Sequence, residues 1–183
     1  MNIVITGGAG FLGSRLARAL LAQGRFSVNG QAAQNIERIT LVDQFQPAAD
    51  LLADPRVRAC VGDLNTLLTP TTQGVAALPA GTDVVYHLAA AVSAECEADF
   101  DLGLRSNLAA TQALFAACRA MGNRPLVVFA SSLAVYGLPA EAPAPSGPWV
   151  VSDDTLPTPQ TSYGIQKFIC EQLLADYTRK GYV

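Results

Sequence analysis

The sequence predicts a three-layer α/β domain built around a mostly parallel sheet. The chain opens with a run of β-branched residues, Ile3-Val4-Ile5, which passes directly into a glycine-rich turn. Four further apolar runs of strand length follow, and segments with helical spacing of apolar residues lie between several of them. With 183 residues, half of them hydrophobic, the chain is large enough for one packed domain and too short for two. We therefore treat residues 1–183 as a single domain.

The glycine-rich turn joins the first strand to a helix that is expected to end at Gly24. Its glycines stand at positions 7, 10 and 13. In such a loop Gly7 turns the chain, Gly10 lets a pyrophosphate approach the backbone, and Gly13 lets helix and strand pack closely. The N–H groups at the start of the helix favour a phosphate. The loop therefore predicts a phosphate site, with a tight turn that holds no ligand as the alternative.

A second strand is predicted over residues 39–43, after a polar segment, residues 25–38, that we expect to be an extended connection or a frayed helix end. The strand ends in Asp43. A carboxylate at this point can accept hydrogen bonds from an adenosine ribose, and its charge repels a 2′-phosphate. Asp43 therefore predicts NAD rather than NADP, although an acid that only caps the strand would look the same.

The third strand is predicted over residues 57–61, and Asp63 behind it could reach an adenine amino group. Residues 69–79, rich in Thr, Pro and Gly, are expected to contain a short helix. The fourth strand runs into the small residues 89–91, which leave room for a ligand. His87 lies within this strand, so we expect a packed, hydrogen-bonded core histidine. This argues against Ser-His-Asp hydrolysis, because the chain has no other histidine.

A long helix is predicted over residues 98–121, where Gly122 is the stop signal. It carries the polar Asn107, which either faces solvent or bonds the backbone beside the site. The fifth strand, residues 126–130, opens into two serines. Ser132 is thereby placed at the carboxyl end of a central strand, where doubly wound sheets bind ligands.

The last helix begins near residue 161, after the proline-rich segment 138–160 that contains Trp149. That segment is either a binding loop or an exposed connection. Tyr163 and Lys167 are four residues apart, so they share one face of the helix. An ammonium near a phenol stabilises the phenolate, which makes Tyr163 a candidate general acid or base. An amphipathic helix with an exposed lysine is the alternative.

The composition excludes several classes of function. The net charge is −3 with scattered cationic residues, which favours neither nucleic acid nor a membrane surface. No apolar run approaches the roughly 18 residues of a membrane span, and the chain begins with a core strand and without a signal peptide, so we expect a cytoplasmic protein. The four cysteines form no CxxC and are expected to be reduced packing residues. With one histidine and no clustered ligands, no metal site is expected.

The ordered set of motifs resembles a known family. Its members here are TGGAGFLG at 6–13, Asp43, Gly62-Asp63-Leu64, His87-Leu88-Ala89-Ala90, Asn107, SSxxVYG at 131–137 and YxxxK at 163–167. Together they are similar to an extended short-chain dehydrogenase/reductase of the NAD-dependent epimerase/dehydratase family. This resemblance implies a Rossmann-type doubly wound domain with helices on both faces of the sheet, NAD as the cofactor, and hydride transfer to or from a small-molecule substrate.

The resemblance also implies a role for each matched residue. Ser132 and Tyr163 are the catalytic serine and acid/base, and Lys167 stabilises the phenolate and binds the nicotinamide ribose. The implied cofactor-binding residues are Gly7, Gly10, Phe11, Leu12, Gly13, Asp43, Asp63, Leu64, Leu88, Ala89, Ala90, Asn107, Tyr163 and Lys167. The family further implies a homodimer through the helices that contain Asn107 and Tyr163.

Residues 97–104 and 153–164 resemble a narrower group, the D-erythronate dehydrogenase-like branch, which oxidises a four-carbon sugar acid at C2 with NAD. A sugar-nucleotide 4-epimerase or dehydratase shares the general motifs, so a nucleotide sugar is the other candidate substrate. The family's sixth strand and its smaller C-terminal substrate domain are expected to be absent from this chain. A non-catalytic NAD-binding module is therefore the alternative of another class.

Overall fold

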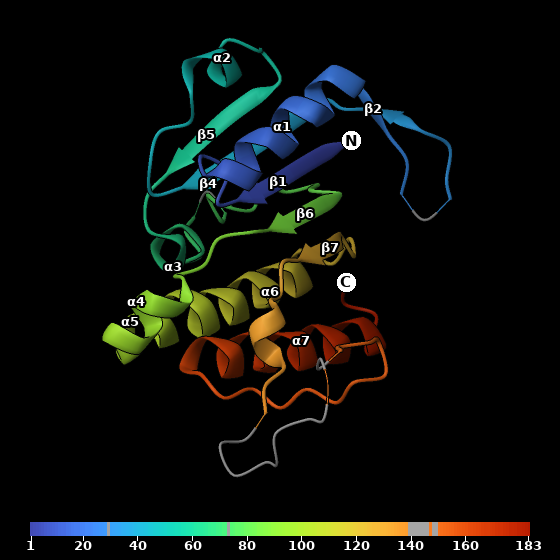
Figure 1. Cartoon of the computed structure of the whole chain (residues 1–183). Coiled ribbons are helices and arrows are strands. Elements are labelled where there is room, and N and C mark those ends of the chain that lie inside the picture. The colour runs from blue at the N-terminus through green and yellow to red at the C-terminus, as the bar shows by residue number, and fades with distance from the viewer. Residues whose placement is uncertain (29, 73, 139–146, 148–149) are drawn as a thin grey trace.

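Five parallel strands form the central sheet of the computed structural model, which describes residues 1–28, 30–72, 74–138, 147 and 150–183 (Figure 1). The spatial order is β5-β4-β1-β6-β7. The strands are β1 (Asn2–Thr6), β4 (Arg38–Asp43), β5 (Val57–Val61), β6 (Val84–His87) and β7 (Leu126–Phe129). β1 pairs with β4 on one side and β6 on the other, so the order reverses at β1. Ligands of doubly wound sheets bind at such a reversal, beyond the carboxyl ends of the strands.

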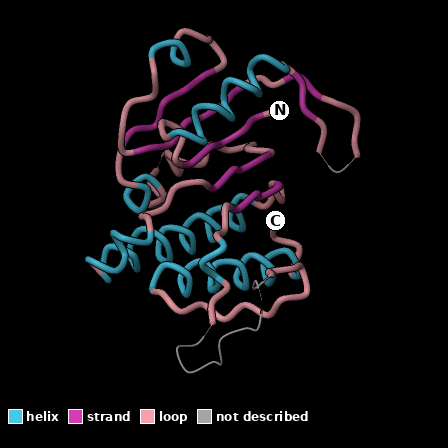
Figure 2. The backbone as a smooth tube through the Cα atoms, viewed as in Figure 1, coloured by secondary structure: helices cyan, strands magenta, loops and turns pink. Residues whose placement is uncertain are grey.

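Alternation along the strands gives the sheet two buried faces. Ile3 and Ile5 of β1 belong to one apolar cluster, and Val4 between them belongs to the other. The first cluster packs beneath α1 (Phe11–Gln23) and α2 (Ala49–Leu52), and the second beneath α6 (Ala110–Met121) and α7 (Ser162–Arg179) (Figures 1 and 2). The predicted Rossmann-type fold with helices on both faces is confirmed.

The helix ends follow the predicted signals in most places. Gly24 and Gly122 adopt left-handed φ angles of 68° and 76° after α1 and α6, as helix stops require. The long helix predicted over residues 98–121 runs over residues 100–121, because Asp99 is extended and caps it. It consists of α5 (Phe100–Gly103), a π-helical segment η1 (Leu104–Ala109) and α6; a separate helix, α4 (Ser93–Ala98), precedes it.

Two local predictions need correction. The short helix expected within residues 69–79 is wrong: the helix is α3 (Leu64–Leu67), which begins earlier because Asp63 caps it. Pro70 disfavours helix at the residue before it, and Gly74 has φ +97°. The described residues of the segment 25–38 contain no helix, which favours the extended connection over the frayed helix end. They include a small antiparallel hairpin of β2 (Arg25–Phe26) and β3 (Gln34–Asn35).

Three features bear on the predictions from composition. In the described part of the chain no helix combines the length and the apolarity that crossing a bilayer requires. All four cysteines are free thiols, and Cys96, Cys118 and Cys170 are buried. Trp149 lies outside the described residues, and residues 150–160 form neither helix nor strand.

Candidate active site

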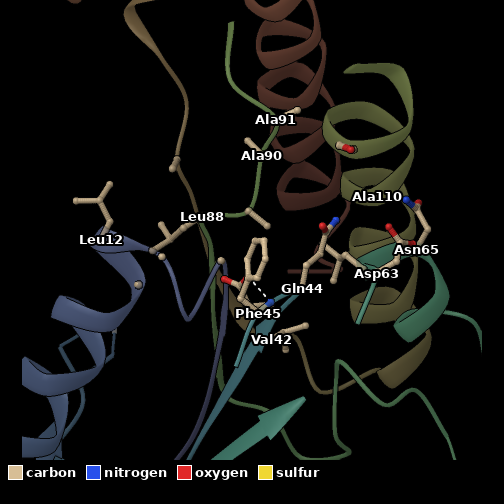
Figure 3. Close-up of a pocket in the computed structure, with 18 of the residues that line it drawn as sticks. Leu12, Val42, Gln44, Phe45, Asp63, Asn65, Leu88, Ala90, Ala91 and Ala110 are labelled. Atoms are coloured by element: carbon tan, nitrogen blue, oxygen red, sulfur yellow. Dashed lines mark hydrogen bonds between the residues drawn. The ribbon is translucent and has the colours of Figure 1, made fainter. Parts of the chain in front are cut away.

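A pocket of about 660 Å³ opens at the carboxyl ends of β1, β4, β5 and β6. Its size lies within the range of small-molecule sites, roughly 300–1,000 Å³. Figure 3 shows side chains from several elements around it: Leu12 from α1, Leu88, Ala90 and Ala91 from the segment after β6, and Asp63 and Asn65 at α3. The lining includes eleven of the predicted cofactor residues: Gly7, Gly10, Phe11, Leu12, Gly13, Asp43, Asp63, Leu64, Leu88, Ala89 and Ala90.

The glycine turn forms one wall of this pocket. Gly7 has φ +69°, and the Gly10 N–H closes the turn by donating to the Gly7 carbonyl at 3.1 Å. A side chain on Gly13 would collide with that same carbonyl, so helix and turn meet there without room for a Cβ. A Cβ on Gly10 would have only the Gly7 oxygen within 4 Å, at 3.2 Å. Gly10 thus leaves open pocket space in front of the backbone, which a phosphate could fill.

Asp43 ties the end of β4 to the glycine turn. Its Oδ2 accepts a hydrogen bond from Ala9 N–H at 3.0 Å, and its Oδ1 accepts one from Phe45 N–H at 3.1 Å. The carboxylate therefore caps the end of the strand, as in the alternative interpretation, and it also faces the pocket. Each carboxylate oxygen can accept a further hydrogen bond, so both roles are compatible.

Asp63 and Leu64 lie where β5 passes into α3. The Asp63 carboxylate accepts a hydrogen bond from Thr66 N–H at 3.1 Å and so caps α3. Several lining residues near this end escaped prediction, and they include Gln44, Phe45 and Asn65. The ring of Phe45 is 73% exposed and stands beside the pocket (Figure 3). An aromatic residue two positions after the acid at a strand end is the signal that could have identified it.

The helix that carries Asn107 presents two stripes, each with a spacing of four residues. Leu102, Ser106 and Ala110 line the pocket. Gly103, Asn107 and Thr111 are buried on the adjacent stripe, which faces α7 and β6. Asn107 is therefore not among the residues that line the pocket. Its side chain instead holds the main chain of Ala91, accepting from the N–H at 2.8 Å and donating to the carbonyl at 3.1 Å.

His87 is a core residue, as predicted. Its Nδ1 lies 2.6 Å from Thr6 Oγ1 and its Nε2 lies 2.8 Å from Thr111 Oγ1. Thr111 donates its own proton to the Asn107 carbonyl, so Nε2 must carry the ring proton and Nδ1 must accept. Burial, with the nearby Lys167 charge, lowers the pKa of His87 to about 3. Thr6 Oγ1 also accepts from Ala89 N–H at 3.2 Å, so this chain of bonds holds the pocket wall.

Tyr163 and Lys167 lie one turn apart near the start of α7, whose first turn is capped by Thr161. Lys167 is only 3% exposed, in contrast to the exposed lysine of the alternative interpretation. Its Nζ donates to the carbonyl of Ala130 at 2.8 Å and lies 5.7 Å from the centre of the Tyr163 ring. Burial lowers the pKa of Lys167. Ala130 itself lines the pocket, so the lysine lies directly behind that wall.

Ser132 begins the short 3-10 turn η2 (Leu133–Val135), and its Oγ accepts from Ala134 N–H at 3.2 Å. Its hydroxyl proton remains available to a ligand. The turn lies close against α7, and the approach is possible because Gly164 has no side chain to collide with the carbonyl of Ala134. The neighbouring Ser131 instead donates to Glu171 of α7. Ser132 thus follows Ala130, the partner of Lys167, by two residues. None of the residues Ser132, Tyr163 and Lys167 is among those that line the pocket.

No group of three or more potential metal ligands occurs in the described ranges. The parallel sheet, the glycine turn at its first strand and the acid at the end of β4 together define a dinucleotide-binding α/β domain, and the pocket and its glycine cradle fit such a ligand. Residues 3–183 match the NAD dependent epimerase/dehydratase family, and the chain belongs to that family. NAD, the cofactor predicted from the sequence, is therefore the cofactor of its family.

Similar proteins point in the same direction. The chain is 49% identical over 183 residues to the D-erythronate dehydrogenase of Cupriavidus necator and 42% identical over 184 residues to that of Haemophilus influenzae. All of this chain is matched in both cases, together with 52% of each relative. The crystal structure of a nucleoside-diphosphate-sugar epimerase from Agrobacterium tumefaciens matches with a TM-score of 0.76 and 40% identity, covering 100% of this chain and 50% of that one. The chain thus spans about half the length of the relatives that it matches.

Proposed function

We propose that this protein is an NAD-dependent dehydrogenase that oxidises a sugar acid such as D-erythronate at C2. The observation that carries the proposal is the buried Lys167, bonded to Ala130 at the pocket wall with Tyr163 one turn away. The 42–49% identity to two D-erythronate dehydrogenases supports the choice of substrate. The geometry supports an oxidoreductase, and the relatives support the particular hydroxy acid.

The fit of a dinucleotide to the pocket supports the assignment of binding residues. The open face of Gly10 and the N–H groups at the start of α1 suit the pyrophosphate. Asp43 suits the adenosine ribose, and Asp63 with Leu64 suits the adenine. The segment containing Ala89 and Ala90 would lie along the cofactor toward Ala130. With this order the nicotinamide end would lie next to α7.

The proposed chemistry divides the substrate's two hydrogens. NAD⁺, when bound, would supply the acceptor for the hydride of the carbinol carbon. The phenolate of Tyr163 accepts the proton of the carbinol hydroxyl, and the positive charge of Lys167 favours that phenolate. Ser132 donates its hydroxyl proton toward the same substrate oxygen and holds it in place while the carbonyl forms. Lys167 would also contact the nicotinamide ribose, for which two of its three N–H groups remain after the bond to Ala130.

The test is an assay of the purified protein with NAD⁺ and D-erythronate, in which NADH is followed by its absorbance. We expect NADH to form in proportion to the erythronate consumed. Turnover of UDP-sugars without any oxidation of erythronate would instead establish the alternative of a nucleotide-sugar 4-epimerase or dehydratase. That alternative is favoured by the structural match to a nucleoside-diphosphate-sugar epimerase.

An alternative of another class is a non-catalytic NAD-binding module, which the match to only about half of each relative favours. Titration of NAD separates the two: binding without turnover of either substrate class would support the module. The buried Lys167, kept beside Tyr163, supports the enzyme.

We further propose a cytoplasmic homodimer formed through the helices that contain Asn107 and Tyr163. The apolar residues Ile165 and Ile169 on α7 and Phe100 on α5 are 46%, 40% and 59% exposed, which suits an interface. Light scattering after size exclusion measures the mass, and fractionation of cells locates the protein. A monomer at micromolar concentration would reject the dimer.

A further inference from the structure

Gln166 is a buried residue of α7 whose side-chain amide is hydrogen-bonded through its oxygen. The residue is 2% exposed. Its Oε1 accepts a hydrogen bond from Asn107 Nδ2 at 2.9 Å, whereas its Nε2 finds no hydrogen-bond partner among the residues that the structure describes. An unpartnered buried N–H group destabilises a fold, and an apolar side chain of similar size would avoid that loss. The presence of glutamine here indicates that the hydrogen bond between its Oε1 and Asn107 has a role.

The orientation of the Gln166 amide is fixed, through Asn107, by the main chain of Ala91 in the pocket wall. Asn107 Oδ1 accepts from Ala91 N–H and Asn107 Nδ2 donates to the Ala91 carbonyl. Because a main-chain N–H only donates and a carbonyl only accepts, only one orientation of the Asn107 amide satisfies both bonds. Nδ2 therefore faces Gln166, and reversing the Gln166 amide would place two donors against each other. The two amides form a directed link from Ala91 to α7.

Gly103 provides the space for this link. A Cβ on Gly103 would lie 2.5 Å from Nε2 and 2.9 Å from Oε1 of Gln166. The backbone of Gly103 is helical, with φ −58° and ψ −48°, so its conformation does not require glycine. The missing side chain therefore serves to admit the Gln166 amide. The three residues Gly103, Asn107 and Gln166 make one fitted contact between the long helix and α7.

The next residue after Gln166 is Lys167, whose Nζ bonds Ala130. A lysine Nζ lies several ångströms from its helix axis, so a rotation of α7 by about 10° would move it by about 1 Å. A displacement of about that size near reacting groups can reduce a rate by about a hundredfold. We propose that Gln166 is a positioning residue: its bond to Asn107 sets the rotation of α7 and so places Lys167 and Tyr163 against the end of the pocket.

This proposal rests on the proposed dehydrogenase function, and the variant Gln166→Met tests it. Methionine keeps the length and removes both the bond to Asn107 and the unpartnered N–H. We expect kcat to fall about tenfold or more and NAD affinity to stay within about twofold. The pH profile of turnover should also change, because a displaced ammonium interacts differently with the phenol. Gln172→Met, at an exposed position on α7, is the matched control and should change none of these.

A merely structural role predicts a different pattern. It would lower the melting temperature and NAD affinity of Gln166→Met while leaving the pH profile unmoved, and that result overturns the proposal. Unchanged kcat and pH profile would overturn it as well. The reciprocal variant Gly103→Ala pushes the Gln166 amide aside and should reproduce the loss of kcat. In the Gln166→Met background the same Gly103→Ala change should cost much less, because methionine can bend away; full additivity would contradict the link.

The positioning role of Gln166 can be tested even if the proposed dehydrogenase function fails. If the unaltered protein oxidises no hydroxy acid, the proposed function fails, and crystal structures of the unaltered and Gln166→Met proteins then decide the positioning role. A Lys167 Nζ beyond hydrogen-bond distance of the Ala130 carbonyl in the variant would support the role. An unchanged Lys167 would reject it.

Discussion

The ammonium of Lys167 donates a hydrogen bond to the main-chain carbonyl of Ala130, 2.8 Å away, and Ala130 is a wall of the glycine-lined pocket. A lysine that is 3% exposed carries a desolvation penalty, which lowers its pKa. Replacing it by methionine, which has a similar length, removes that penalty together with the charge. We expect Lys167→Met to melt at the same or a higher temperature and to lose turnover by about a hundredfold or more. Lys180→Met, exposed beyond the end of the same helix, should change neither; a lower melting temperature with full activity for Lys167→Met would refute the role.

Tyr163 is proposed to accept the hydroxyl proton, and phenylalanine keeps its ring without that function. We expect Tyr163→Phe to lose activity by about 10²–10⁴-fold while it binds NAD nearly as well as the unaltered protein. Steady-state kinetics and isothermal titration measure the two quantities. Tyr177→Phe on the same helix is the control and should stay active. Substantial activity in Tyr163→Phe would assign the acid/base to another group.

Asp43 holds the glycine turn with one oxygen and Phe45 with the other. Asp43→Asn keeps one acceptor and removes the charge that would oppose a 2′-phosphate. Unit charges about 4 Å apart interact by about 4 kcal/mol near a protein surface, so the preference for NAD over NADP should fall by about tenfold or more. Titration of both cofactors gives the ratio. Asp63→Asn removes a second pocket carboxylate and should leave the NAD/NADP affinity ratio nearly constant. If both variants changed the ratio equally, the location of Asp43 next to the ribose would not be the cause of the preference.

Gly10 and Gly13 differ in what a methyl group would meet. At Gly10 the Cβ finds only the Gly7 oxygen at 3.2 Å, and its φ of −70° suits alanine, so Gly10→Ala should fold but bind NAD at least about tenfold more weakly. At Gly13 the Cβ meets the backbone of the turn itself, so Gly13→Ala should lose stability. Thermal melting and NAD titration distinguish the two. Equal NAD affinity for Gly10→Ala and the unaltered protein would move the phosphate away from this turn.

His87 links stability to pH. Its pKa in the folded protein is about 3, below the ordinary 6.5, so the unfolded chain binds a proton in this range that the folded chain does not. The contribution of the neutral His87 to the free energy of unfolding is fully present above pH 6.5. As pH falls from 6.5 toward 3, the free energy of unfolding should fall by about 1.4 kcal/mol per pH unit. Urea unfolding of the unaltered protein and His87→Gln at several pH values isolates this slope. Parallel pH curves for the two proteins would contradict it.

The sequence predicted the sheet well because each strand is a nearly continuous apolar run between turn signals, and both faces of the sheet are buried. The glycine turn, Asp43 and Asp63 were placed at the pocket because the carboxyl ends of parallel strands meet at one edge. The short helix predicted within residues 69–79 shows where prediction from the sequence fails. The helix is α3, and the hydrogen bond of its cap at Asp63 decides where it begins. Propensity alone does not reveal that bond.

The direction of a side chain on a long helix was harder to predict. Asn107 was expected either to face solvent or to bond the backbone beside the site. It is buried and bonds the Ala91 backbone, while Ser106 and Ala110 line the pocket. One residue of helix rotation separates those outcomes, and the π-helical segment changes the rotation locally. Phe45 and Asn65 were missed because they belong to none of the matched motifs, although each stands two residues after a predicted acid.

The two stripes of the long helix also constrain how this protein can change in evolution. One stripe lines the pocket and consists of Leu102, Ser106 and Ala110. The other packs against α7 and β6 and consists of Gly103, Asn107 and Thr111. Substitutions on the first stripe can therefore alter which molecule is accepted without disturbing α7. A single-residue deletion before Leu102 would rotate the stripes by one position and send the amide of Asn107 into the ligand space. Point substitution, and not a change of length, is thus the route by which new ligand specificity can arise in this helix.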